Sequence, residues 1–149
     1  MRRSPLSASR RARRGVAAVE FAILLPFLCF VFVVGVDFCR VFYFSLTVSN
    51  CARNGALMGS LYASTPIDFP QYASVQAAAQ AAAQADASNL NLQDLNVASS
   101  TDTSTSPTAV IVTVTYPFTT ITQYPGIPRQ TDLSRSVRMS VVPATPTFH

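Results

Sequence analysis

The longest apolar stretch of the chain lies near its N-terminus. Residues 21–36 read FAILLPFLCFVFVVGV and carry no charged side chain. Sixteen helical residues extend about 24 Å, which is shorter than the roughly 30 Å hydrocarbon core of a bilayer. A helix that starts at Val16 reaches about 31 Å and brings Glu20 close to one end of the span. The pattern therefore predicts a single membrane-spanning helix over about residues 16–37.

Apolar side chains keep a helical spacing beyond this span. Positions 37–62 contain no proline, and from Phe38 to Ala56 apolar residues recur three to four positions apart, as on a helix with one buried face. Pro66 then interrupts the pattern. We expect one helix over residues 16–62, bent at Pro26 because the proline ring removes a backbone hydrogen bond.

Residues 63–149 predict a small domain of mixed structure. Alanine and glutamine dominate residues 73–88, which favours a helix. Residues 109–116 and 133–142 alternate between apolar and polar side chains, as half-buried strands do. Residues 99–107 are polar and should form a loop, while the prolines between the strands predict a connection of about sixteen residues. The expected fold class is α+β: a long N-terminal helix, then a small helix and a two-stranded or slightly larger antiparallel sheet.

Charge is concentrated at the N-terminus. The net charge is +4, yet the first fourteen residues hold six arginines and no acid, and the remainder is slightly acidic. Arginine enrichment before a span places the N-terminus in the cytoplasm. The small domain should then lie outside the inner (cytoplasmic) membrane. Basic arms also bind nucleic acid, but this one runs directly into the apolar stretch without interleaved aromatic residues, so no nucleic-acid partner is expected.

Export signals share some of these features. A secretory signal also begins with a basic region and an apolar stretch, but no small-x-small cleavage pattern follows here, because residues 34–38 read VGVDF. Residues 36–38, directly before Cys39, lack the small side chains that a lipoprotein site needs. Glu20 also lies too early in the apolar stretch for a twin-arginine signal. We therefore expect the helix to remain in the protein as an anchor.

A charged residue inside a span costs a few kcal/mol near the bilayer centre, so Glu20 requires a reason. It lies five residues after Gly15, which itself follows the basic leader 1–15. This arrangement resembles the processing site of type IV pilins, and Glu20-Phe21 resembles the variant found in the Flp (tight adherence) branch. The resemblance implies that a prepilin peptidase cuts after Gly15, so that Val16 becomes the first residue and Glu20 the fifth. A carboxylate one turn from the new amine is also favoured by the helix dipole.

Two further blocks follow on the long helix, DFCRVFY at residues 37–43 and NCARNGA at residues 50–56. Together with the start of the helix they resemble the TadE-like pseudopilin family, over roughly residues 10–60. The resemblance implies a structural component of pilus or secretion-system assembly, whose partners are other pilins or pseudopilins, pilus-assembly components, the prepilin peptidase and the lipid bilayer. The candidate residues for helix packing and assembly are Pro26, Asp37, Phe38, Arg40, Asn50, Ala52, Arg53, Gly55 and Gly59.

Two of these positions also have a physical interpretation. Asp37 and Arg40 lie three residues apart on one helix face and can form an ion pair where the helix leaves the membrane. Gly55 and Gly59 form a small-xxx-small pair that permits close approach of another helix, although ordinary packing uses the same spacing.

Catalytic chemistry is not expected. The only histidine is the last residue, His149, and no nucleophile, phosphate loop or metal-ligand cluster stands out. No cofactor and no small-molecule substrate are therefore predicted. Cys29, Cys39 and Cys51 are too far apart along one helix to bridge each other, and Cys51 is a candidate for a disulfide with another chain.

Two other functions remain open from the sequence. The chain could be an unprocessed, signal-anchored envelope protein that acts as a partner-binding module, or a secreted soluble protein whose mature start lies beyond Val36. The N-terminus of the protein in its native membrane distinguishes these alternatives from a processed pseudopilin.

Overall fold

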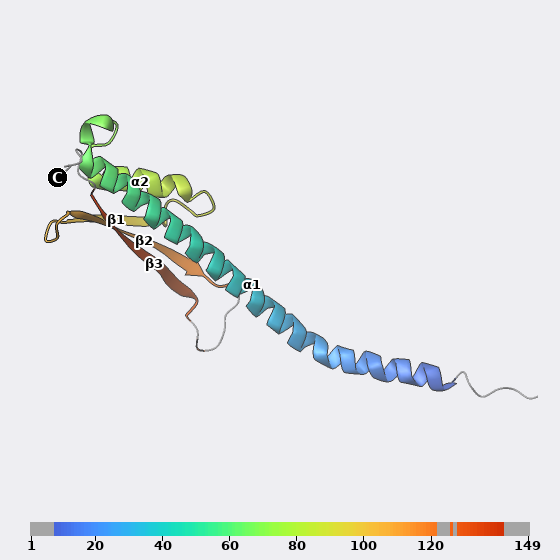
Figure 1. Ribbon diagram of the computed structural model, residues 1–149. Helices are drawn as coiled ribbons and strands as arrows, with labels where there is room; N and C mark the ends of the chain where they lie inside the picture. The colour runs from blue at the N-terminus through green and yellow to red at the C-terminus, as the bar shows by residue number, and fades with distance from the viewer. Residues whose placement is uncertain (1–7, 122–125, 127, 142–149) are drawn as a thin grey trace, which may run out of the picture. The chain divides into compact units, whose positions relative to one another are not determined.

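The computed structural model describes residues 8–121, 126 and 128–141, with side chains from Val16 onward. A long helix is followed by a short 3₁₀ turn, a second helix and three strands, which confirms the expected α+β class. The elements are α1 (Ala8–Ser64), η1 (Pro66–Asp68), α2 (Val75–Asp86), β1 (Asn96–Asp102), β2 (Ala109–Thr119) and β3 (Gln130–Ser140) (Figure 1).

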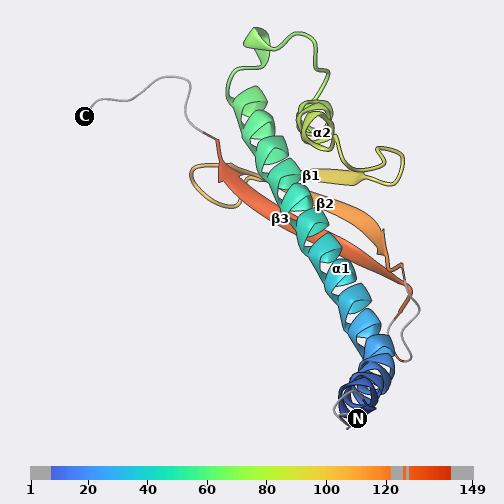
Figure 2. The ribbon, with the colours of Figure 1, turned by 90° about the vertical axis from the view of Figure 1, so that its right-hand side faces the viewer.

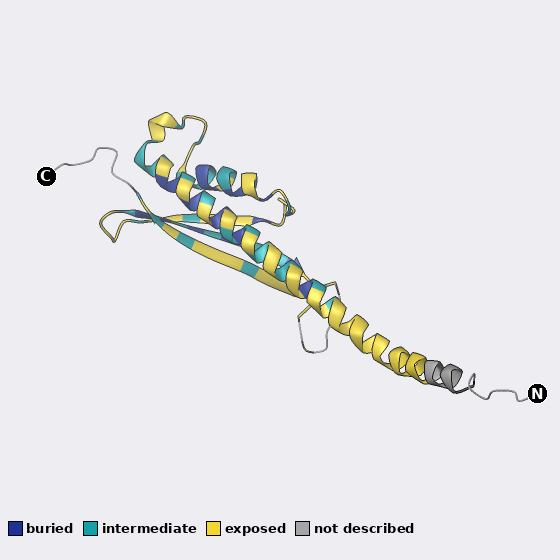
Figure 3. Cartoon of the chain, turned by 45° about the vertical axis from the view of Figure 1, so that its right-hand side comes forward, coloured by how far each residue is buried: buried dark blue, intermediate teal, exposed yellow. Residues whose placement is uncertain are grey.

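The chain divides into two compact units, residues 1–39 and residues 40–149. In the first unit, α1 begins at Ala8 rather than near residue 16, because the alanines and arginines that precede Gly15 are good helix formers. Its apolar side chains are exposed, as the yellow N-terminal part of α1 in Figure 3 shows. Among the described residues, α1 is the one helix long and apolar enough to cross a membrane.

In the second unit, the C-terminal part of α1 and the whole of α2 cover one face of the sheet (Figures 1 and 2). The sheet is antiparallel with the order β1-β2-β3, so β2 is central. Alternate residues of β2 point toward the helices, and Val110, Val112 and Val114 are completely buried there. The opposite face carries hydroxyl side chains, including Thr113, which donates to Ser136 at 3.1 Å.

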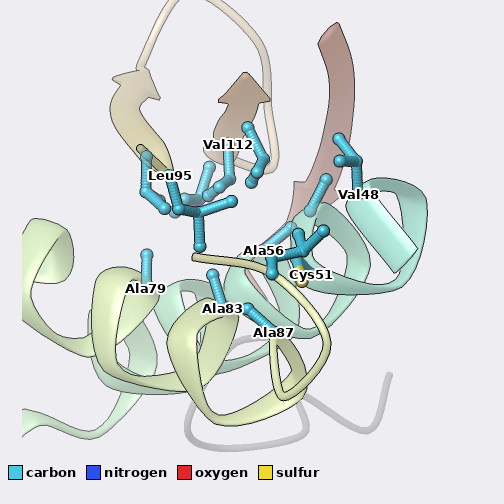
Figure 4. Close-up of a cluster of buried hydrophobic side chains, with 13 residues drawn as sticks. Val48, Cys51, Ala56, Ala79, Ala83, Ala87, Leu95 and Val112 are labelled. Atoms are coloured by element: carbon cyan, nitrogen blue, oxygen red, sulfur yellow. The ribbon is translucent and has the colours of Figure 1, made fainter. Parts of the chain in front are cut away.

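The core of this unit is built from small residues on the helices and valines on the sheet (Figure 4). Alanines on α2 allow its backbone to approach α1 and β2 closely, as their high helix propensity and lack of bulk permit. The buried cluster consists of Val48, Cys51, Ala52, Ala56, Ala79, Ala83, Ala87, Leu90, Leu95, Val97, Val110, Val112 and Val114.

The prediction of a polar loop over residues 99–107 is wrong for its first part, because β1 extends to Asp102. This edge strand carries one buried apolar side chain, Val97, so its alternation was too weak to indicate a strand. Its free edge is bound by Gln76 of α2. The side-chain amide nitrogen of Gln76 donates to the Val97 carbonyl at 2.7 Å. The backbone amide of Ser99 donates to the side-chain oxygen of Gln76, also at 2.7 Å.

The connection between β2 and β3 is also shorter than predicted, residues 120–129 instead of about sixteen residues. Pro117 does not end β2, although proline usually interrupts a central strand. The Val141 amide donates to Thr108 and the Thr120 amide to Arg129, so even-numbered residues of β2 bond to β3. Pro117 therefore faces the other side, where β1 has already ended because Asn96 pairs with Thr115.

Candidate processing and assembly sites

The four candidate processing residues lie within one stretch of α1 in the first unit. Val16, Glu20 and Phe21 are exposed, and Val16 and Glu20 are four residues apart, which places them on one helix face a single turn apart. Gly15 weakens the helix at this point by roughly 0.5–1 kcal/mol relative to alanine. Gly15 therefore lowers the local stability of the helix next to the bond where cleavage is expected.

The DFCRVFY block contains an arginine that is fixed by aromatic rings. The Arg40 guanidinium lies 5.2 Å from the centre of the Phe118 ring and 5.9 Å from that of Phe44. The two rings are themselves 5.7 Å apart, so Arg40 joins α1 to the end of β2 through cation–π contacts. Asp37 is 5% exposed and Phe38 is 72% exposed. The expected Asp37–Arg40 ion pair stays a prediction.

Gly55 and Gly59 face α2 and β2 of the same chain. A Cβ on Gly55 would lie 3.0 Å from the Ala79 carbonyl oxygen and 3.2 Å from Val112. A Cβ on Gly59 would lie 3.2 Å from Val110 and 3.5 Å from Val75. The structure therefore uses both glycines for close packing inside the second unit.

The NCARNGA block divides between two faces of α1. Ala52 is fully buried in the core, together with Cys51 and Ala56, whereas Asn50 and Arg53 are exposed. The exposed positions continue at helical spacing in both directions and form a line along the outside of α1. We call this line the outer stripe; it consists of Phe42, Leu46, Asn50, Arg53, Leu57 and Leu61.

A groove of about 360 Å³ adjoins the outer stripe between α1 and α2. It is predominantly apolar, and one of its lining residues, Asn54, donates its side-chain amide to the Asp86 carboxylate. This groove could not be predicted from the sequence, because alanine forms both the groove wall and the buried face of α2. The lining residues are Asn54, Leu57, Met58, Leu61, Tyr72, Ala81, Ala82 and Ala85.

Cys51 does not lie where another chain could reach it. Its side chain is fully buried, and burial, followed by the negative charge of Asp86, raises the pKa of the thiol. The proposed disulfide of Cys51 with another chain is therefore contradicted in the folded domain. All three cysteines are free, with Cys29 and Cys39 exposed. Within the described residues no group of histidine, cysteine, aspartate and glutamate could hold a metal ion.

Residues 15–57 match the family model described as TadE-like protein. This segment is TadE-like. The match begins at the expected cleavage position, includes both sequence blocks and ends two residues before Gly59, so it confirms the resemblance. No curated protein and no solved structure matches the chain. The TadE-like segment thus lies within α1 and includes both its apolar part and most of the part that packs on the sheet. The helix α2 and the sheet lie outside the match.

Proposed function

We propose that this chain is a TadE-like minor pilin or pseudopilin, a structural component of a tight-adherence (Flp) pilus or related secretion assembly in the cell envelope. The observation that carries the proposal is the TadE-like match over residues 15–57 on a helix whose apolar part is exposed. A single span near residues 16–37 would anchor it in the inner membrane. The arginines of the leader favour a cytoplasmic N-terminus and an extracytoplasmic domain.

Processing is the first step of the proposed mechanism. The prepilin peptidase hydrolyses the Gly15–Val16 peptide bond, which releases the leader as a carboxylate and leaves an α-amine on Val16. Glu20 lies one helical turn from this amine and near a new helix N-terminus, where a carboxylate is stabilised by the helix dipole. In an assembly, Glu20 can also neutralise the terminal amine of a neighbouring subunit, which reduces the cost of keeping its charge in the bilayer.

The second unit supplies the contacts outside the membrane. Its core is closed by α1, α2 and β2, so its exposed surfaces remain for other pilins and for components of the assembly machinery. This role is structural, and processed subunits can enter an extracellular pilus or remain at its base.

Replacement of Glu20 by alanine tests this function in cells that assemble the pilus. We expect the Glu20→Ala variant to stay in the membrane at normal abundance while sheared surface pili are lost. Asp94→Ala removes a carboxylate from an exposed loop and serves as the matched control. Pili at wild-type abundance in the Glu20→Ala strain would contradict the proposal and favour the unprocessed, signal-anchored alternative.

A further inference from the structure

The outer stripe is unusually apolar for a surface outside a membrane span. Phe42 is 60% exposed, Leu46 50%, Leu57 46% and Leu61 41%. Phe42 and Leu46 form one exposed apolar pair and Leu57 and Leu61 another, and clustered exposed apolar residues of this kind mark contact surfaces. Because all of these side chains lie on one line of α1, the natural occupant is another helix, which packs against such a line at 8–10 Å between axes.

Arg53 interrupts this apolar line with a positive charge. Its side chain is exposed and makes no ion pair or hydrogen bond within the part of the chain that the structure describes. The residue next to it, Asn54, donates to the carboxylate of Asp86, which is also exposed and carries the charge of opposite sign. Arg53 and Asp86 thus place a positive and a negative charge at the same height along α1, and both side chains are exposed.

We propose that the outer stripe and the adjoining groove bind a second copy of this chain. The proposal rests on the membrane anchoring included in the proposed function. Two copies inserted through the same segment and related by a two-fold axis along the membrane normal place equal residue numbers at equal distances from the membrane. Arg53 of one copy then lies at the same height as Asp86 of the other, where the two can form an ion pair. The two-fold symmetry produces this ion pair twice.

The same symmetry accounts for the apolar residues and for the groove. Leu57 and Leu61 line the groove and also belong to the outer stripe, so in a parallel pair they meet the equivalent leucines and the alanine wall of α2. The two arginines near the axis would repel each other, and the two Asp86 carboxylates neutralise them. A partner with a different sequence would have to supply both charges at these levels, whereas a second copy does so by its own sequence.

Charge reversal tests this proposal with the full-length protein in its native membrane. Two differently tagged copies are co-expressed, solubilised in mild detergent under reducing conditions, and purified through one tag; the recovery of the other is measured. We expect Arg53→Asp and Asp86→Arg each to reduce recovery roughly fivefold or more, since like charges replace opposite ones. The double variant should restore it. Asp132→Arg, a charge reversal on exposed β3, should leave it unchanged.

Three results would overturn the pairing: no recovery with the wild-type chain, recovery insensitive to both reversals, or failure of the double variant to restore recovery while its domain melts like the wild type. Asp86→Asn, which keeps a side-chain oxygen for Asn54, should lower recovery less than Asp86→Arg. The mature N-terminus is determined on the same samples. Pairing with an uncut leader would refute the proposed function alone, and a start at Val16 without pairing would refute this inference alone.

Discussion

The Ala79 carbonyl oxygen lies 3.0 Å from the position that a Cβ on Gly55 would occupy. Two helices that approach so closely leave no room for a side chain, so the glycine in the TadE-like segment determines how α2 packs on α1. The contact also explains why α2 is built from alanines, because larger side chains would separate the helices.

Substitution of Gly55 should therefore destabilise the second unit. Valine at this position clashes with the Ala79 carbonyl and with Val112, and such overpacking costs about 1–3 kcal/mol. For a unit of this size, we expect the thermal midpoint to fall by roughly 4–8 °C for each kcal/mol. Circular dichroism of the detergent-solubilised chain measures this change. Gly35 has no atom within 4 Å of its Cβ position, and Gly35→Ala should leave the midpoint unchanged. An unaltered midpoint for Gly55→Val would refute the packing described here.

Gln76 should stabilise the edge of the sheet through its two hydrogen bonds to β1. Gln76→Ala leaves the Val97 carbonyl and the Ser99 amide without these partners, and we expect a loss of about 1–2 kcal/mol in the free energy of unfolding. Hydrogen exchange of the Ser99 amide should also become faster. Gln80→Ala changes the same residue type on an exposed position of α2 and provides the control. Equal effects of Gln76→Ala and Gln80→Ala on the free energy of unfolding would show that the hydrogen bonds to β1 do not stabilise the domain.

Cys51 should react slowly with maleimide reagents in the folded protein. Its side chain is buried, and the raised pKa of the thiol reduces the thiolate fraction at neutral pH. The control is a Ser100→Cys variant in a Cys51→Ala background, which places a thiol on an exposed position of β1 outside the outer stripe. Mass spectrometry after a timed reaction compares the two sites. Modification of Cys51 as fast as the control thiol would contradict its burial, and denaturant should remove the difference.

The link between β1 and β3 should depend on pH. Hydrogen bonds from Ser104, and then the charge of Arg138, lower the pKa of the Asp102 carboxyl from its usual 3.8. The Arg138 guanidinium lies 2.9 Å from this carboxylate. Because the pKa is lowered by folding, the carboxylate stabilises the domain above the unfolded value and loses this effect as the pH falls through the folded value. The difference in thermal midpoint between wild type and Asp102→Asn should be constant above about pH 5 and shrink below pH 4. A difference in thermal midpoint that grows as the pH falls would contradict this prediction.

The sequence predicted the structure best where a pattern of residues is compatible with a single type of element. The apolar stretch and the alternation in β2 and β3 predicted the long helix and two strands, because each pattern repeats over many residues. β1 was missed because its stability comes from Gln76 and from pairing with β2, neither of which is visible within NVASSTD. The groove was missed for a related reason. The contacts that define it come from α1 and α2, which are separated in sequence, and alanine carries no periodic signal.

The N-terminus of the protein isolated from its native membrane tests the central claim most directly. N-terminal sequencing or intact-mass measurement should show a chain that begins at Val16, four residues before Glu20, whenever the prepilin peptidase is present. A chain that keeps residues 1–15 in the presence of the peptidase, or one that begins beyond Val36, would contradict the account.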